Sequence, residues 1–317
     1  MEVLKGVFRG SQNLLENARN QTNGCKKSCR LCQLRNKNIS AVIIAYNDYP
    51  AVYRCIKSLK GQVSTICIVD NSTIKDQFAY NTDEVIYIKN ENNIGLDKAL
   101  NIGVKEVLKR QIDWVLLLDQ DSVVDKNMLN NMLNSFDNAD DQSIAQIVPL
   151  VYDINRDKYL PSLIYNKFSL EKIDRPQQDT FVDFQITSGS LIRKEIFEKI
   201  GFMDETFFID YIDFDYCFRI RSSKHKILLS KDALLTHSLG KKSNKMGIDF
   251  IEHASIRIFY QVKNRLILMK RYGHIFPFFV ISETRNLIFK FFKIIILEND
   301  KKEKLQNYFR GLLKGLK

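Results

Sequence analysis

The feature that most constrains this chain is an apolar run that stops abruptly on two carboxylates. Four consecutive apolar residues, Val115 to Leu118, are followed by Asp119 and Asp121 with one residue between them. Such a short unbroken run is typical of a strand buried on both faces of a parallel sheet. Open α/β sheets bind ligands at the carboxyl ends of their strands, and paired carboxylates there suit a divalent cation, Mg²⁺ or Mn²⁺. A plain Asp-rich turn is the structural alternative.

Three further apolar segments also run into polar residues. Residues 39–45 lead to Asn47 and Asp48, 65–69 lead to Asp70 and Asn71, and 85–88 lead to Asn92 and Asn93. Helices are expected between them, from Pro50 to about Lys60 and from about Leu96 to Arg110. This alternation predicts a doubly wound, mostly parallel α/β sheet in which the polar ends share one edge. One such ending is usually a turn, whereas four in succession favour a polar cleft.

Two common phosphate-binding motifs do not occur at the expected place. No Gly-x-Gly-x-x-Gly follows the first strand, and the chain has no Gly-x4-Gly-Lys, which excludes a dinucleotide fingerprint and a P-loop. Farther along, residues 152–180 are polar and are predicted to form a long loop. A strand is expected over 181–187, and a helix over 191–200.

A second acidic cluster follows about 90 residues after the first. Asp210, Asp213 and Asp215 alternate there with Phe and Tyr residues. If 211–222 is helical, Asp213 lies in the first turn, and its aromatic neighbours could desolvate it and prepare it to accept a proton. Ordinary capping acids are the alternative. His237 ends another apolar segment, so it is a candidate metal ligand as well as a candidate structural histidine.

The C-terminal region carries the whole net charge. Residues 241–317 hold 17 of the 48 Lys and Arg residues but only 6 of the 37 Asp and Glu residues, and the net charge is +11. This distribution argues against nucleic-acid binding by the body of the protein and indicates an anionic partner for the tail. The apolar segment 275–297 is interrupted by charged residues, which predicts an amphipathic helix lying on an anionic lipid surface. Core packing is the alternative.

Residues 1–36 are expected to be a polar N-terminal extension. They contain no apolar signal segment, so we expect a cytoplasmic protein, peripheral on the inner face of the cell membrane, with reduced cysteines. Cys25, Cys29 and Cys32 have a cluster-like spacing. A zinc site would need a fourth nearby Cys or His, so a reduced extension is the interpretation we favour.

Together these residues resemble the family 2 glycosyltransferases, which are inverting enzymes with the GT-A fold. The resemblance covers about residues 39–272. Within that family, the chain is most similar to bacterial rhamnosyltransferases of surface polysaccharide synthesis. The motifs that carry the resemblance are Ala45-Tyr-Asn47, Val69-Asp-Asn-Ser72, Asn92-Asn-Ile-Gly95, Leu118-Asp-Gln-Asp-Ser122, Ser188-Gly189, the segment from Phe207 to Arg219, and Thr236-His237.

The resemblance implies a GT-A catalytic domain over 37–240 and a basic, helical, membrane-associated region over 241–317. The implied general base is Asp213 or Asp215, because Ile212 stands where the family frequently has Glu. The nucleotide-sugar-binding residues would be Tyr46, Asn47, Asp70, Asn71, Asn93, Gly95, Lys98, Asp119 and Gln120. The metal ligands would be Asp119, Asp121 and His237, and the acceptor-binding residues Ser188, Gly189 and Asp210.

The implied reaction moves a sugar, expected to be L-rhamnose from dTDP-rhamnose, to a hydroxyl of a lipid-linked or oligosaccharide acceptor. A metal would stabilise the departing diphosphate, and a carboxylate would take the hydroxyl proton. A nucleotidyltransferase is an alternative, but it would normally show a Gly-rich basic loop, which residues 45–50 lack. A non-catalytic glycan- or lipid-binding module would not need the acids at 119, 121 and 213. A homo-oligomer is left open.

Overall fold

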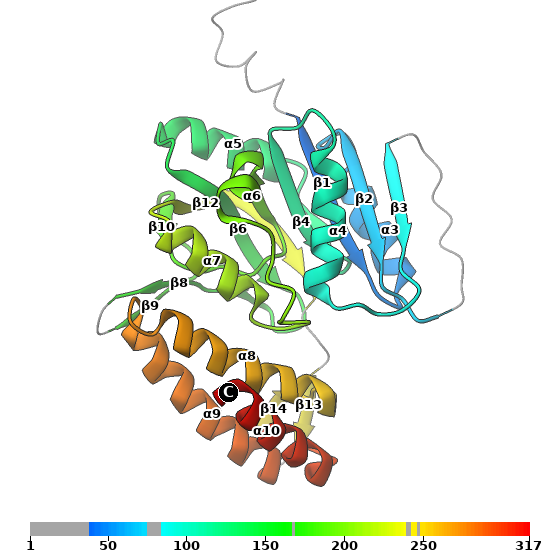
Figure 1. Ribbon diagram of the computed structural model, residues 1–317. Coiled ribbons are helices and arrows are strands. Elements are labelled where there is room, and N and C mark those ends of the chain that lie inside the picture. The colour runs from blue at the N-terminus through cyan, green and yellow to red at the C-terminus, as the bar shows by residue number, and fades with distance from the viewer. Residues whose placement is uncertain (1–37, 75–83, 167–168, 239–241, 246–247) are drawn as a thin grey trace, which may run out of the picture. The chain divides into compact units, whose positions relative to one another are not determined.

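The computed structural model describes residues 38–74, 84–166, 169–238, 242–245 and 248–317 (Figure 1). Residues 38–317 form one compact unit. The cysteine triplet of the N-terminal extension lies outside the described residues. Within them, Cys55, Cys67 and Cys217 are buried free thiols. The expected division into a catalytic domain and a C-terminal region stays a prediction.

Parallel strands form the first half of the sheet. β1 (Ile39–Ala45) lies between β2 (Thr65–Asp70) and β4 (Trp114–Asp119), and β3 (Val85–Lys89) is beside β2. Every residue of β1 and β2 is buried, as their apolar composition requires. The register places Ala45 beside Asp70, and Ile44 beside Asp119. The carboxyl ends of these strands therefore share the predicted edge.

The second half of the sheet mixes parallel and antiparallel strand pairs. β11 (Ser190–Arg193) is antiparallel to both β4 and β6 (Ile144–Asp153), and β12 (Lys226–His237) is parallel to β6. β6 and β12 therefore run in the direction of β4, and His237 reaches the same edge as Asp119. β10 (Thr180–Val182) and β5 (Ser122–Val124) pair with β12, and β7 (Lys158–Leu160) pairs with β6. The predicted α/β class with a mostly parallel sheet is confirmed.

Two helices follow the first and third strands. α3 (Tyr49–Ser58) begins where Asp48 accepts a hydrogen bond from the Ala51 N–H at 3.0 Å. α4 (Leu96–Leu108) packs on β1 and β2 (Figure 1). A Cβ atom at Gly103 would lie 2.4 Å from Cγ1 of Val42, so glycine is what permits this close approach. The remaining helices of this part are α5 (Met128–Ala139), α6 (Lys194–Ile200) and α7 (Ile212–Ser222).

Three local predictions were wrong because strand pairing overrides local sequence preference. Residues 152–180 are not a long loop: they contain β7 and a hairpin of β8 (Ser162–Tyr165) and β9 (Leu170–Ile173). The strand predicted over 181–187 ends at Val182. The helix predicted over 191–200 begins only at Lys194, because the preceding residues form β11 between β4 and β6.

The C-terminal region contains α8 (Ser255–Tyr272), α9 (Pro277–Ile296) and α10 (Lys301–Leu316), preceded by a hairpin of β13 (Lys242–Lys245) and β14 (Ile248–Ile251). α10 was not predicted. It packs closely on α8, where a Cβ at Gly311 would lie 2.8 Å from the Phe259 carbonyl oxygen. Among the described residues, no helix combines the length and the apolar character that crossing a membrane requires.

Candidate active site

Three predicted metal ligands converge at the carboxyl edge of the sheet. Oxygen atoms of Asp119 and Asp121 and a ring nitrogen of His237 all lie within 4.8 Å of one another. Nδ1 of His237 is 3.4 Å from an Asp121 oxygen, and Nε2 is 4.0 Å from an Asp119 oxygen. Burial, together with the charge of Asp119, raises the pKa of Asp121 to about 6, although His237 opposes this shift. Two crowded carboxylates beside an imidazole fit a divalent cation, which would relieve their repulsion.

Two buried serines hold this triad in place. The Ser122 hydroxyl lies 3.0 Å from Nδ1 of His237 and 2.6 Å from the Ser188 hydroxyl. Ser188 in turn accepts a hydrogen bond from the backbone N–H of Asp119 at 3.0 Å. These contacts connect the ends of β4 and β12. They give Ser188 a positioning role, and its predicted contact with the acceptor stays a prediction.

Gly189 also lies where backbones approach closely. Its φ is +87°, and a Cβ there would be 2.7 Å from the Pro149 ring. A side chain at position 189 would therefore collide with Pro149 of β6. A direct role of Gly189 in acceptor binding stays a prediction.

The predicted nucleotide-binding residues line the neighbouring strand ends. Oε1 of Gln120 accepts from the backbone N–H of Tyr46 at 2.7 Å, and its Nε2 donates back to the Tyr46 carbonyl at 3.0 Å. The Asn47 side chain accepts from the backbone N–H of Thr73 at 2.9 Å. These bonds join the ends of β1, β2 and β4 into one polar edge, as predicted.

Asp70 is fully buried and well supplied with donors. It accepts hydrogen bonds from the hydroxyls of Tyr49 and Tyr87, from Nζ of Lys89 and from the backbone N–H of Ser72. Burial opposes ionisation, but these hydrogen bonds outweigh it and lower the pKa of Asp70 to about 2. Asp70 therefore carries a stable negative charge, and its contact with the nucleotide base stays a prediction.

The loop before α4 connects the end of β2 to the segment that carries the second acidic cluster. The Asn71 side chain donates to the carbonyl of Gly95 at 3.0 Å, and Asn93 accepts from the backbone N–H of Gly95 at 3.0 Å. Gly95 has a φ of +99°, and a Cβ there would lie 2.8 Å from the Phe208 ring. Buried Asp97 accepts from the Phe208 backbone N–H at 2.5 Å. Sequence reasoning missed Asp97, while Lys98 beside it is exposed.

Asp213 is the less constrained acid of the second cluster. It is half-buried, and its carboxylate accepts a hydrogen bond from the backbone N–H of Phe214 at 2.9 Å. Desolvation by burial, with added repulsion from Asp210 and Asp119, raises the pKa of Asp213 to about 7. Because the charge of Asp119 reaches Asp213, the two acidic clusters face the same region. A carboxylate with a pKa near neutrality can accept a proton at physiological pH.

Asp215, two residues later on α7, has a different environment. Its side chain is 1% exposed, and one oxygen accepts from Nε of Arg219 at 2.9 Å. The other accepts from the Tyr272 hydroxyl at 2.8 Å and from Arg271 at 3.2 Å. One carboxylate oxygen is therefore held within α7, and the other joins α7 to α8. These contacts distinguish Asp215 from Asp213, whereas the sequence alone left both as candidates for the general base.

Asp210 forms a bidentate ion pair with Arg257 from α8. The two nitrogen–oxygen distances are both 2.8 Å. Hydrogen bonding to Asp210, supported by the charges of Asp119 and Asp213, raises the pKa of Arg257. The guanidinium thus lies within electrostatic reach of both acidic clusters, and sequence reasoning missed it.

The loop that carries Asp210 is strained and is held by α8. Phe208, Asp210 and Tyr211 all have φ between 61° and 67°, a region that costs non-glycine residues about 1–2 kcal/mol each. The Asn264 amide donates to the carbonyls of Phe207, Ile209 and Asp210 at 2.8–2.9 Å. A residue of the C-terminal region therefore fixes the loop next to Asp213.

A buried polar triad continues this support into α9. The Tyr211 hydroxyl donates to Glu283 at 2.6 Å, and Arg265 pairs with the same Glu283 oxygen at 2.7 Å. Arg265 also donates to the Tyr211 hydroxyl. The residue just before α7 is thereby joined to both α8 and α9.

Comparison with known proteins identifies this arrangement. The model of glycosyl transferase family 2 matches residues 40–201. The dTDP-rhamnosyl transferase RfbF of Shigella flexneri is 30% identical over 291 residues, which is 89% of this chain and 96% of that protein. The chain belongs to glycosyl transferase family 2. It is a glycosyltransferase similar to rhamnosyltransferases, so it uses a nucleotide-sugar donor and a glycan acceptor.

A more distant relative and a solved structure are also similar to this chain. The low-salt glycan biosynthesis hexosyltransferase Agl10 of Haloferax volcanii is 23% identical over 203 residues, which is 61% of this chain and 65% of that protein. The structure of GalNAc-T7 with UDP, GalNAc and Mn²⁺ has a TM-score of 0.54 and 16% identity, covering 74% of this chain and 48% of that one. This structural likeness confirms the GT-A fold predicted for the glycosyltransferase.

Proposed function

We propose that the glycosyltransferase is an inverting enzyme in which Asp213 is the general base and Asp119, Asp121 and His237 hold a divalent metal, Mg²⁺ or Mn²⁺. The arrangement of the acids carries the proposal: Asp119 and Asp121 converge with His237, and Asp213, half-buried in the first turn of α7, is near enough to Asp119 for that charge to raise its pKa. Inverting transfer needs a base on one side of the sugar and a charge-stabilising group at the leaving diphosphate.

The proposed mechanism is a single displacement. The acceptor hydroxyl loses its proton to a carboxylate oxygen of Asp213 as its oxygen attacks the anomeric carbon of the donor sugar. The bond from that carbon to the diphosphate breaks, and the electron pair leaves with the diphosphate. A metal held by Asp119, Asp121 and His237 would supply Lewis-acid stabilisation of that leaving group. No residue is needed as a covalent nucleophile, and Asp215 is excluded as base because its oxygens are occupied.

We propose dTDP-L-rhamnose as the donor, since the relative with 30% identity is named a dTDP-rhamnosyl transferase. The acceptor is proposed to be a lipid-linked or oligosaccharide chain of surface polysaccharide synthesis. Reaction with such an acceptor suits a protein peripheral to the inner face of the cell membrane. The polar edge formed by Tyr46, Asn47 and Gln120 is proposed to receive the nucleotide.

A donor panel tests this proposal. Purified protein is incubated with Mn²⁺ and one donor at a time: dTDP-rhamnose, UDP-glucose, UDP-galactose or GDP-mannose. Release of the nucleoside diphosphate is measured with and without oligosaccharide acceptors. We expect release with dTDP-rhamnose and a product of inverted anomeric configuration by NMR. Retention of configuration would overturn the single displacement, and preference for another donor would overturn the sugar assignment.

A further inference from the structure

We propose that α9 and α10 form a docking surface for an anionic lipid bilayer. The proposal goes beyond the transfer reaction and does not depend on it. The surface, here called the apolar face, consists of Ile281, Ile288, Phe289 and Phe292 of α9 with Phe309 and Leu313 of α10, all exposed.

The apolar face is continuous across the two helices. The α9 members are separated from Ile281 by seven, eight and eleven residues, which places them on one side of the helix. The ring of Phe291 lies 5.6 Å from that of Phe292 and 6.1 Å from that of Phe309, measured between centroids, so it bridges α9 and α10. Phe289 is 64% exposed and Leu313 is 67% exposed. Large apolar side chains gathered in such a patch mark an interaction surface.

The opposite side of α9 is fully used in packing. Glu283, Leu287 and Ile294 are buried there, and Glu283 holds Tyr211 and Arg265. On the apolar face, Phe292 and Phe309 contact Phe291, but each of the six side chains stays more than half exposed. The face lies across one helix, about 10 Å, from the contacts that fix the loop next to Asp213. An acceptor embedded in a lipid surface would be presented close to the site.

Charge decides between a bilayer and a second copy of the chain. Exposed basic residues lie on the same two helices: Arg285 on α9, and Lys302, Arg310, Lys314 and Lys317 on or next to α10. A two-fold contact through this face would bring these like charges together, which is unfavourable. An apolar surface bordered by Lys and Arg matches the chemistry of an anionic lipid interface, where acyl chains receive the apolar groups and headgroups receive the cations.

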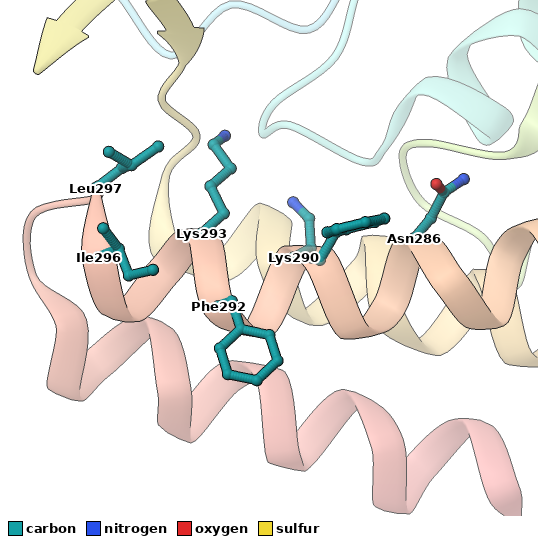
Figure 2. A pocket seen from close by; sticks show the side chains of 7 residues that line it. Asn286, Lys290, Phe292, Lys293, Ile296 and Leu297 are labelled. Carbon is teal, nitrogen blue, oxygen red and sulfur yellow. The ribbon is translucent and has the colours of Figure 1, made fainter. Parts of the chain in front are cut away.

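A recess along α9 adjoins the apolar face. This cavity of about 470 Å³ is lined by Phe289 and Phe292 of the face and by Asn286, Lys290, Lys293 and the last residues of the helix. Figure 2 shows Lys290 and Lys293 projecting from one side of α9 and Phe292 from the other. The Lys293 ammonium is paired with Glu298 at 2.9 Å, whereas that of Lys290 donates to the neutral Gln261 side chain. Apolar walls beside the Lys290 ammonium fit the combination of hydrocarbon and anionic headgroup in a lipid.

Vesicle sedimentation of the full chain tests the proposal. Vesicles of phosphatidylcholine with one-third phosphatidylglycerol are compared with vesicles of phosphatidylcholine alone. We expect binding to the anionic vesicles to be at least tenfold tighter and to weaken with added salt. The variant Phe289→Ser/Phe292→Ser should bind anionic vesicles on the order of 100-fold more weakly, because two apolar groups no longer enter the interface.

Two matched variants complete the experiment. Ile154→Ser/Phe181→Ser removes two exposed apolar side chains from outside the apolar face and should bind like the wild type. Lys302→Gln/Lys314→Gln/Lys317→Gln removes charge alone and should abolish the preference for anionic vesicles. Thermal unfolding should be unchanged in all three variants. Equal binding by the Phe289/Phe292 variant, no vesicle binding by the wild type, or a dimer that this variant dissociates would overturn the proposal. Donor hydrolysis is measured in parallel, so a failure of the proposed reaction is recognised separately.

Discussion

Two acids of the same helix, Asp213 and Asp215, have opposite physical situations. Asp215 is saturated with donors from α7 and α8, so its charge is compensated and stabilises packing. Asp213 is desolvated, and none of the described Lys, Arg or His residues forms an ion pair with it; two other carboxylates raise its pKa further. Desolvation without compensation costs stability and is characteristic of catalytic acids and bases. The contrast leads to two predictions at the level of single residues.

Substitution of the two acids should separate catalysis from folding. In Asp213→Asn the proton acceptor is lost, so kcat should fall about 10²–10⁴-fold, with the midpoint of thermal unfolding unchanged or raised. In Asp215→Asn the contacts to Arg219 and Arg271 weaken, and unfolding free energy should fall by about 1–3 kcal/mol. Rate assays and calorimetry on both variants check this. Full activity of Asp213→Asn would refute its role as base.

The pH dependence follows from the same carboxylate. Asp213 must be ionised to accept a proton, so kcat/KM should fall as pH falls through about 7. The charge of Asp119 contributes to the raised pKa of Asp213. A cation bound to Asp119 would offset that charge, so the midpoint of the pH–rate profile should then lie below about 7. Asp210→Asn removes a second negative neighbour and should move it lower still, so activity persists at more acidic pH.

Rate profiles from pH 5 to 9 for the wild type and Asp210→Asn measure these midpoints. An unchanged midpoint in Asp210→Asn would mean that another group controls the rate.

Strand ends made the first acidic cluster predictable. Asp119 and Asp121 directly follow a buried strand, and His237 ends another, so their convergence follows from parallel pairing. The function of Asp215 was not predictable, because its partners Arg271 and Tyr272 are more than 50 residues away on α8. No local pattern indicates such a contact.

At the level of elements, the segment from Phe207 to Tyr211 depends on α8. Its left-handed residues are unfavourable in isolation, and the Asn264 amide compensates by donating to three of its carbonyls. Strained backbone of this kind persists only where surrounding structure determines it. α8 therefore positions the segment that leads into Asp213, although it lies outside the region matched by the family model.

Asn264→Ala tests this support. The three carbonyls lose their donor, so we expect a loss of about 1–3 kcal/mol in unfolding free energy and a tenfold or greater fall in kcat. The nucleotide-sugar dissociation constant should change less than kcat, because the strand ends are untouched. Ser282→Ala, a buried polar substitution on α9, serves as the control. Unchanged kcat with lowered stability would restrict Asn264 to a structural role.

A second element-level prediction concerns the contact between α4 and β1. Gly103→Ala places a methyl group 2.4 Å from Val42 and should cost about 1–3 kcal/mol. Val42→Ala makes room, so the double variant should be more stable than the sum of the single effects predicts, with a coupling of about 0.5–3 kcal/mol. Chemical denaturation of the four proteins measures the cycle. If the two effects simply add, α4 shifts away from β1 in Gly103→Ala and the added methyl group does not contact Val42.

Element prediction failed where pairing is nonlocal. Leu191 to Arg193 has a sequence that suits a helix, yet this segment is inserted between β4 and β6, whose partners lie more than 40 residues away. The nearly continuous apolar runs of β1, β2 and β4 needed no such information, because each segment is buried on both faces. Local pattern was therefore sufficient for the central strands only.

At the level of the whole molecule, the candidate site is assembled from segments far apart in the chain. β4 and β12 contribute the metal triad, α7 contributes the base, and α8 and α9 hold the segment before it. The diphosphate of a donor would share the cation with Asp119 and Asp121, so metal and donor should bind cooperatively. Without the cation, the negatively charged diphosphate would be repelled by the two carboxylates.

This coupling gives the last prediction. With Mn²⁺ alone or dTDP-rhamnose alone, we expect small shifts in the thermal midpoint, and with both a shift larger than their sum, since binding to the folded state stabilises it. His237→Ala removes a ligand and should abolish the excess, while EDTA should reduce the wild-type shift to that of the donor alone. Lys98→Ala, an exposed residue beside the site, tests for donor contact and should leave the Mn²⁺ shift unchanged. A full donor shift in EDTA would contradict a metal-bridged diphosphate, whereas an additive response would place metal and donor at separate sites.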